Sequence, residues 1–111
     1  MDNKTVKRRK HNMKTYYFTL TGTKHHYGKD FIEKDMIITL EKEPDNEYDK
    51  EAIKVCLKPF GCIGYVANSP YTVIGDDCYS AGRLYDKIPD TIEATVLFKL
   101  DHGIICRVDI E

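Results

Sequence analysis

The segment Glu43-Pro-Asp-Asn-Glu-Tyr-Asp-Lys-Glu-Ala-Ile-Lys-Val55 combines a turn with the beginning of a strand. Pro44 restricts its own φ, and Asp45 and Asn46 can hydrogen-bond to their own backbone, so the first half is expected to turn. From residue 52 onward apolar and polar residues alternate, with Ile53, Val55 and Leu57 on one face. This period of two predicts a half-buried β-strand.

Tyr48 and Asp49 stand where this turn becomes the strand. A loop held by a rigid strand presents its side chains at fixed positions, and such loops often carry binding residues. The sequence therefore predicts an aromatic ring and a carboxylate at a defined place on the surface.

Further alternating segments predict that most of the chain is β-structure. The predicted strands cover residues 15–21, 36–41, 52–57, 62–66, 92–100 and 104–110. Asp101-His102-Gly103 joins the last two, which are expected to form an antiparallel hairpin with a glycine-containing turn. In residues 92–100, Ile92, Ala94, Val96, Phe98 and Leu100 keep a strict period of two.

Two short helices are expected between the fourth and fifth strands. Ser69-Pro70 offers an N-cap followed by proline at the first helical position, which predicts a helical turn over 71–74. A second helix is predicted over 80–87 and ends before Pro89. Six strands and two short helices indicate a mainly β protein with a small, mostly antiparallel barrel.

Size and composition indicate one soluble domain. A chain of 111 residues with 41% hydrophobic and 32% charged residues forms a single core of ordinary composition. Its apolar runs are far shorter than the roughly 20 residues of a membrane helix, and no apolar segment of a secretory signal follows the basic N-terminus. The four cysteines include no C-x-x-C pair, which disfavours a zinc site. A cytoplasmic setting is predicted.

Charge is distributed unevenly along the chain. Residues 1–14 hold six basic residues and one acidic residue, a net charge of +5, whereas residues 15–111 hold 11 basic and 17 acidic residues, a net charge of −6. The predicted organisation is a basic, flexible arm over 1–14 and a barrel domain over 15–111. The arm either is simply solvated or attracts phosphate groups. An acidic body argues against a broad basic DNA-binding face, so any nucleic-acid contact should be local.

The motifs of common enzymes are absent from the sequence. It contains no phosphate-binding loop, no dinucleotide-binding glycine fingerprint and no nucleophile elbow. Asp76-Asp77 is more typical of a solvated or capping pair than of catalysis. His25-His26 would point to opposite faces of a strand, which disfavours a shared metal. The sequence predicts neither an enzyme nor a cofactor, and a metal-dependent hydrolase is a distant alternative.

The segment Gly22-Thr-Lys-His-His-Tyr-Gly28 has the composition of a binding loop. Glycines at both ends allow sharp turns, and between them lie a lysine and three rings. Single-stranded nucleic acid is bound by this mixture of charge for phosphates and rings for bases. The alternative is that Tyr27 and Tyr48 fill the core with their hydroxyls tied to the backbone.

Three segments resemble the HIRAN domain in their sequence and order: 22–28, 43–55 and Ile63-Gly-Tyr-Val66. The resemblance extends from about Tyr16 to Ile110. This family occurs at the N-terminus of helicase-like transcription factor and related SWI2/SNF2 proteins, and as short standalone bacterial proteins, which this chain looks like. The resemblance implies an OB-like β-barrel with two helices. It also implies binding of free 3′ ends of single-stranded DNA, as eukaryotic members do.

The resemblance also implies roles for individual residues. Lys24 and His25 occupy the places of a basic–aromatic pair that follows the first glycine. Asn46 matches a polar residue of the DNA pocket, Tyr48 a stacking ring, and Asp49 the aspartate directed at the terminal 3′-hydroxyl.

Two further positions depart from the DNA-binding members. Tyr65 stands where they carry histidine, and Asn68 falls near a lysine that grips phosphate. These differences predict weaker or altered end recognition. Two functions follow: a module for single-stranded DNA with free 3′ ends, in DNA repair or processing, or a non-catalytic protein-interaction or regulatory module. The oligomeric state is left open.

Overall fold

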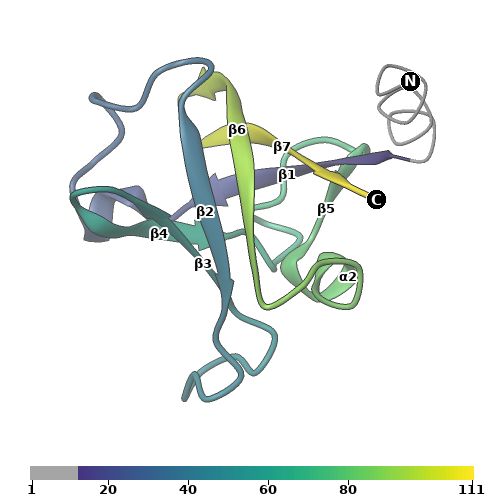
Figure 1. Ribbon diagram of the computed structural model, residues 1–111. Coiled ribbons are helices and arrows are strands. Elements are labelled where there is room, and N and C mark those ends of the chain that lie inside the picture. Colours follow the sequence, from purple (N-terminus) through teal and green to yellow (C-terminus); the bar gives the residue numbers. More distant parts are fainter. Residues whose placement is uncertain (1–12) are drawn as a thin grey trace.

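The computed structural model describes residues 13–111, and these form a closed barrel (Figure 1). The strands are β1 (Lys14–Thr21), β2 (Ile37–Lys42), β3 (Ile53–Leu57), β4 (Gly61–Val66), β5 (Cys78–Tyr79), β6 (Thr91–Leu100) and β7 (Gly103–Ile110). Six of them follow the order β4-β3-β2-β6-β7-β1, and β1 also pairs with β4, which closes the barrel. β5 is an extra strand, parallel to β1. The mainly β architecture predicted from the alternation is confirmed.

The barrel is closed by a short antiparallel contact between β1 and β4. Leu20 lies opposite Val66 and Thr21 opposite Tyr65. Gly64 makes this approach possible, since a Cβ atom there would lie 2.6 Å from the Thr21 carbonyl oxygen. Closure removes the free edges that an open sheet would present.

Alternating side chains of the strands fill the core. The buried apolar residues include Phe18, Leu20, Ile38, Leu40, Ile53, Val55, Ile63, Val96, Ile104 and Val108, with Leu84 from the helix. Burying a side chain of this size contributes roughly 1.5–3 kcal/mol. The predicted inward positions of the 52–57 strand are thus confirmed at Ile53 and Val55.

β6 departs from its predicted alternation. Ala94 and Val96 are buried, but Phe98 is 58% and Leu100 40% exposed. The pairing with β7 shifts register between Val96 and Phe98. A β-bulge inserts one extra residue and so turns the following side chains to the other face. The strict period of two in the sequence therefore does not correspond to one continuous buried face beyond Val96.

The helical elements are shorter than predicted. α2 covers Ala81–Tyr85, with the Ser80 hydroxyl accepting a hydrogen bond from the Arg83 N–H. The N–H groups of Thr72 and Val73 both donate to the Ser69 carbonyl, and this makes a single turn. Residues 71–74 therefore form no helix. A 3₁₀ turn, η1 (Thr23–His25), lies instead in the glycine-flanked loop. The two-residue strand β5 was not predicted.

The predicted basic arm, residues 1–14, lies almost entirely outside the described residues, so its role stays a prediction. Within residues 13–111, no helix has the length and apolar character needed to cross a membrane.

Candidate nucleic-acid interface

Asn46 organises the loop between β2 and β3. Its side-chain oxygen accepts hydrogen bonds from the N–H groups of Tyr48 (2.8 Å) and Asp49 (3.0 Å). Its amide nitrogen donates to Glu43 Oε1 at 3.1 Å. An asparagine that bonds to the backbone two and three residues ahead enforces a turn. The side chain of Asn46 therefore ties the loop into a turn, as predicted.

Asp49 is anchored from two sides. Its Oδ1 accepts from the Glu51 N–H (2.9 Å) and its Oδ2 from the amide of Asn68 (2.8 Å). Asn68 in turn accepts from the N–H of Gly82 in α2 (2.8 Å). A carboxylate has about four acceptor sites, so Asp49 retains capacity to accept a hydrogen bond from a ligand hydroxyl. The chain segment after β4 and the helix α2 thus fix its orientation.

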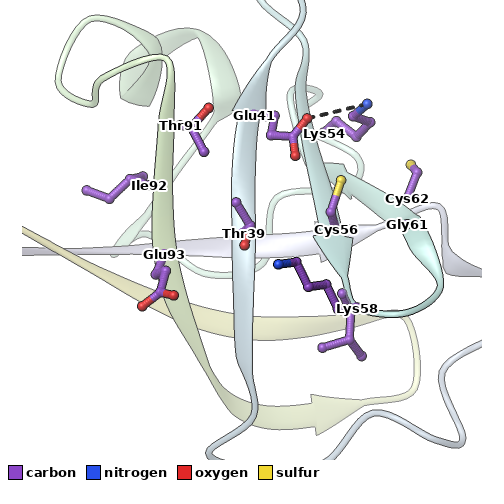
Figure 2. A pocket seen from close by; sticks show the side chains of 11 residues that line it. Thr39, Glu41, Lys54, Cys56, Lys58, Gly61, Cys62, Thr91, Ile92 and Glu93 are labelled. Atoms are coloured by element: carbon purple, nitrogen blue, oxygen red, sulfur yellow. Dashed lines mark ion pairs between the residues drawn. The ribbon is translucent and has the colours of Figure 1, made fainter.

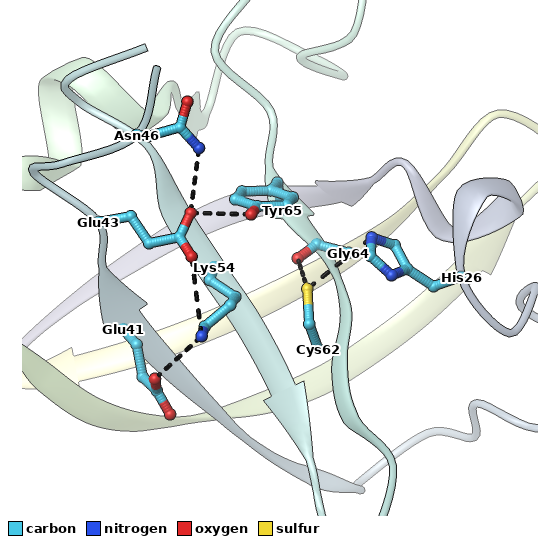
Figure 3. Close-up of polar contacts among 8 residues, drawn as sticks. All are labelled: His26, Glu41, Glu43, Asn46, Lys54, Cys62, Gly64 and Tyr65. Atoms are coloured by element: carbon cyan, nitrogen blue, oxygen red, sulfur yellow. Dashed lines mark hydrogen bonds and ion pairs between the residues drawn. The ribbon is translucent and has the colours of Figure 1, made fainter. Parts of the chain in front are cut away.

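Glu43 connects this loop to the barrel wall (Figure 3). Its Oε1 accepts from the Tyr65 hydroxyl at 2.8 Å, and Lys54 Nζ lies 3.7 Å from Oε2. Burial acts to raise the pKa of Glu43, but hydrogen bonds from Asn46 and Tyr65 and the Lys54 charge together hold it below its usual value. Glu43 is therefore a stable anion beneath the loop.

Tyr65 acts as a hydrogen-bond donor within this network. Burial, followed by its hydrogen bond to Glu43, raises the pKa of Tyr65 well above its ordinary value. Its hydroxyl therefore keeps its proton and its bond to the glutamate. Tyr65 consequently supports the loop from β4, rather than supplying the charge that histidine could carry at this position.

Tyr48 presents its ring to solvent. It is 93% exposed, and it borders a depression of about 500 Å³ together with Lys42, Asn46 and Tyr65. Tyr27 is also 57% exposed, so the alternative that these two tyrosines fill the core is wrong. The Tyr48 ring is free to stack on a flat ligand that enters this depression.

Lys24 and His25 lie apart from this network. Both are exposed on η1 and border a different depression, of about 800 Å³, with Lys29, Tyr71 and His102. The structure therefore brings together five of the seven predicted residues, Asn46, Tyr48, Asp49, Tyr65 and Asn68, and places the basic–aromatic pair on a neighbouring surface.

His26 lies between the two surfaces and was not among the predicted site residues. Its ring centroid is 6.4 Å from that of Tyr65, and its Nε2 is 3.8 Å from the Cys62 sulfur (Figure 3). The adjacent histidines lie in a turn instead of a strand, so the argument from opposite strand faces does not apply. Gly22 and Gly28 were the signal for that turn. Among residues 13–111 no three potential metal ligands converge.

A third depression, of about 720 Å³, lies on the outer face of β2, β3, β4 and β6 (Figure 2). Its wall includes the Glu41–Lys54 ion pair (3.5 Å) and the thiols of Cys56 and Cys62, which lie opposite each other in register. None of the predicted site residues borders it.

Fold and site together define a small β-barrel with a rigid polar loop, a binding module in its architecture. The sequence model of the HIRAN domain family matches residues 13–101. The chain therefore belongs to the HIRAN domain family, as the resemblance predicted, and this membership supports a nucleic-acid-binding module.

A solved structure shares the fold. The crystal structure of the HIRAN domain of human HLTF superposes with a TM-score of 0.61 at 20% sequence identity, covering 86% of this chain and 74% of that one. No curated protein matches the sequence. The OB-like description of the barrel stays a prediction.

Proposed function

We propose that the protein binds single-stranded DNA at free 3′ ends through the β2–β3 loop, in DNA repair or processing, in the cytoplasm. The observation that carries the proposal is the Asp49 carboxylate, which is fixed by Glu51 and Asn68 and follows the exposed Tyr48 directly in the chain. A carboxylate accepts a hydrogen bond from a free hydroxyl, whereas it repels a phosphate at the same place.

The remaining proposed residues act around this carboxylate. Tyr48 stacks on the terminal base, an interaction worth roughly 1–3 kcal/mol, and Asn46 holds both residues in place. Lys24 and His25 contribute a charge and a further ring from the neighbouring depression. Tyr65 and Asn68 support the pocket through Glu43 and Asp49.

The test is fluorescence anisotropy with one short single strand ending in either a 3′-hydroxyl or a 3′-phosphate, at low and physiological salt. We expect the protein to prefer the hydroxyl, and Asp49→Ala to remove that preference. Asp45→Ala, in the same loop and equally a lost carboxylate, is the matched control and should keep it. If Asp49→Ala discriminates like the unmodified protein, the proposed role of Asp49 is wrong.

An alternative function, a protein-interaction module, is favoured by one specific feature. Tyr27, Phe31 and Phe60 form an aromatic cluster with ring centroids 5.0–6.4 Å apart, and Tyr27 and Phe60 are 57% and 43% exposed. Exposed apolar patches mark binding surfaces. Absence of binding to either oligonucleotide would favour this alternative.

A further inference from the structure

Three cations around α2 are each held over a tyrosine ring. The pairs are Arg83–Tyr79, Lys42–Tyr85 and Lys87–Tyr16, with 4.2, 4.6 and 5.8 Å from the charged atom to the ring centroid. Tyr16 and Tyr79 meet edge to face at 5.0 Å. We call these six residues the α2 stripe.

The cations of the α2 stripe form no close ion pair with a carboxylate within residues 13–111. Glu51, Asp86 and Asp90 belong to the same region, yet none of the ion pairs found in residues 13–111 involves Lys42, Arg83 or Lys87. Arg83 and Lys87 are exposed. In a domain whose net charge is negative, unpaired cations on one surface favour an anionic ligand.

The rings give these cations defined positions. A cation over an aromatic face gains roughly 0.5–1 kcal/mol at an exposed site, so its side chain samples fewer conformations before a ligand arrives. Binding then loses less side-chain entropy. Arg83 and Lys87 remain exposed beside their rings, and Lys42 is half-buried.

The α2 stripe is connected to the proposed DNA site. The Gly82 N–H between Ala81 and Arg83 donates to Asn68, and Asn68 donates to Asp49. Lys42 borders the depression beside Tyr48. Figure 1 shows α2 and the β2–β3 loop toward the same end of the barrel. A DNA strand whose 3′ end is bound at Asp49 would therefore have the α2 stripe next to it.

We propose that Lys42, Arg83 and Lys87 bind the phosphates of the single strand upstream of its 3′ end. This inference rests on the proposed function and adds the path of the nucleic acid. Arg83 offers two parallel N–H groups to a phosphate, and the lysines act as point charges. Each phosphate neutralised on a single strand changes the slope of log affinity against log salt by about 0.7.

The test compares the full chain with Arg83→Gln/Lys87→Gln. The ligands are a trinucleotide and an oligonucleotide of about 12 nucleotides, a length that small barrels cover, each with a 3′-hydroxyl or a 3′-phosphate. We expect the variant to bind the long strand at least about tenfold more weakly, with a salt slope reduced by about 1.4, which corresponds to two lost phosphate contacts. Affinity for the trinucleotide and the preference for the hydroxyl should be unchanged.

Two further variants separate the proposal from loss of net charge and from misfolding. Lys34→Gln/Lys58→Gln removes two exposed cations elsewhere and should leave the long-strand affinity close to that of the unmodified protein. Arg83→Lys, with Lys87 unchanged, keeps both positive charges. Its salt slope should therefore equal that of the unmodified protein.

The outcomes distinguish the two proposals. Equal effects of Arg83→Gln/Lys87→Gln and Lys34→Gln/Lys58→Gln would overturn the α2 stripe as a phosphate site while leaving end recognition intact. A selective loss with the stripe variant, but no preference for the 3′-hydroxyl, would support the stripe and overturn the proposed function. Vesicles containing phosphatidylserine serve as a further ligand. If Arg83→Gln/Lys87→Gln lost binding only to these vesicles and bound DNA like the unmodified protein, the stripe proposal would also be overturned.

Discussion

Glu43 is the residue whose protonation controls the loop beneath the proposed DNA site. Its pKa is held below the ordinary value, so the unfolded chain takes up its proton at a higher pH than the folded protein. The stabilisation from Glu43 is present above the unfolded value of about 4.3 and is lost as pH falls through the folded pKa. Below that point Tyr65 and Asn46 face a neutral acid.

We therefore predict that Glu43→Gln lowers the thermal unfolding midpoint at neutral pH, because it removes the charge that Lys54 and the two donors stabilise. The difference from the unmodified protein should shrink as pH falls below about 4. Unfolding followed by circular dichroism at several pH values measures it. A difference that does not change with pH would show that the charge of Glu43 is unimportant.

A second prediction at this scale concerns Cys56. Burial, then the charge of Glu41, raises the pKa of this thiol to about 11, and Lys54 offsets part of the rise. Since only the thiolate reacts with iodoacetamide, Cys56 should be alkylated slowly at neutral pH and faster as pH approaches 11. Glu41→Gln should lower the pKa and speed the reaction.

Peptide mass spectrometry after timed alkylation measures this rate at each pH. Glu93→Gln, which changes another carboxylate of the same depression, is the control and should leave the Cys56 rate unchanged. An equal acceleration by both substitutions would contradict the role of Glu41.

Local chemistry explains which residues of the site were predictable. Asn46 acts on N–H groups two and three residues ahead, so the turn was evident from the sequence. The bond from Tyr65 to Glu43 spans 22 residues and depends on how β3 pairs with β4. Spacing along the chain carries no information about that register.

At the scale of elements, the close approach of β1 and β4 makes Gly64 essential. A Cβ there would lie 2.6 Å from the Thr21 carbonyl oxygen and 2.7 Å from Leu20 Cδ1. We predict that Gly64→Ala destabilises the protein by about 1–3 kcal/mol, as other overpacked cores are. Chemical denaturation gives the free energy of unfolding directly.

Gly82→Ala is the matched control for this prediction. Its Cβ would meet the Glu51 carboxylate at 2.5 Å, but that group ends a flexible side chain, and alanine favours the helix. We expect little change in stability. If Gly64→Ala were equally mild, the barrel would be closed less tightly than the structure indicates.

Elements with a long, regular alternation were predictable and irregular ones were not. β7 follows the alternation that the sequence shows, with Ile104, Cys106 and Val108 buried. β3 and β4 follow it only in part, because their pairing shifts register between Val55 and Cys56. The bulge of β6 arises from pairing with β7, and β5 is two residues long and depends on β1. Residues 71–74 had a suitable cap and proline, yet a capped turn without a following apolar face does not extend into a helix.

For the whole molecule, the residues that the resemblance implied for DNA binding lie on two surfaces, each with its own depression. Asp49 belongs to the hydrogen-bonded loop whose Tyr48 borders one depression, whereas Lys24 and His25 border the other. Among residues 13–111, neither Lys24 nor His25 takes part in the side-chain hydrogen bonds of Asp49. Mutations without shared partners usually act additively, within about 0.5 kcal/mol. The two surfaces should therefore contribute independently to DNA binding.

We predict that Lys24→Ala/His25→Ala weakens binding of a 3′-hydroxyl oligonucleotide but keeps the preference over a 3′-phosphate. Combined with Asp49→Ala, its effect on the binding free energy should add within about 0.5 kcal/mol. Tyr48→Ala with Asp49→Ala should instead deviate from additivity, because Asn46 holds both residues. Anisotropy titrations of the single and combined variants measure these cycles. Strong coupling between His25 and Asp49 would mean that both contact the terminal nucleotide, and the two surfaces would then form one site.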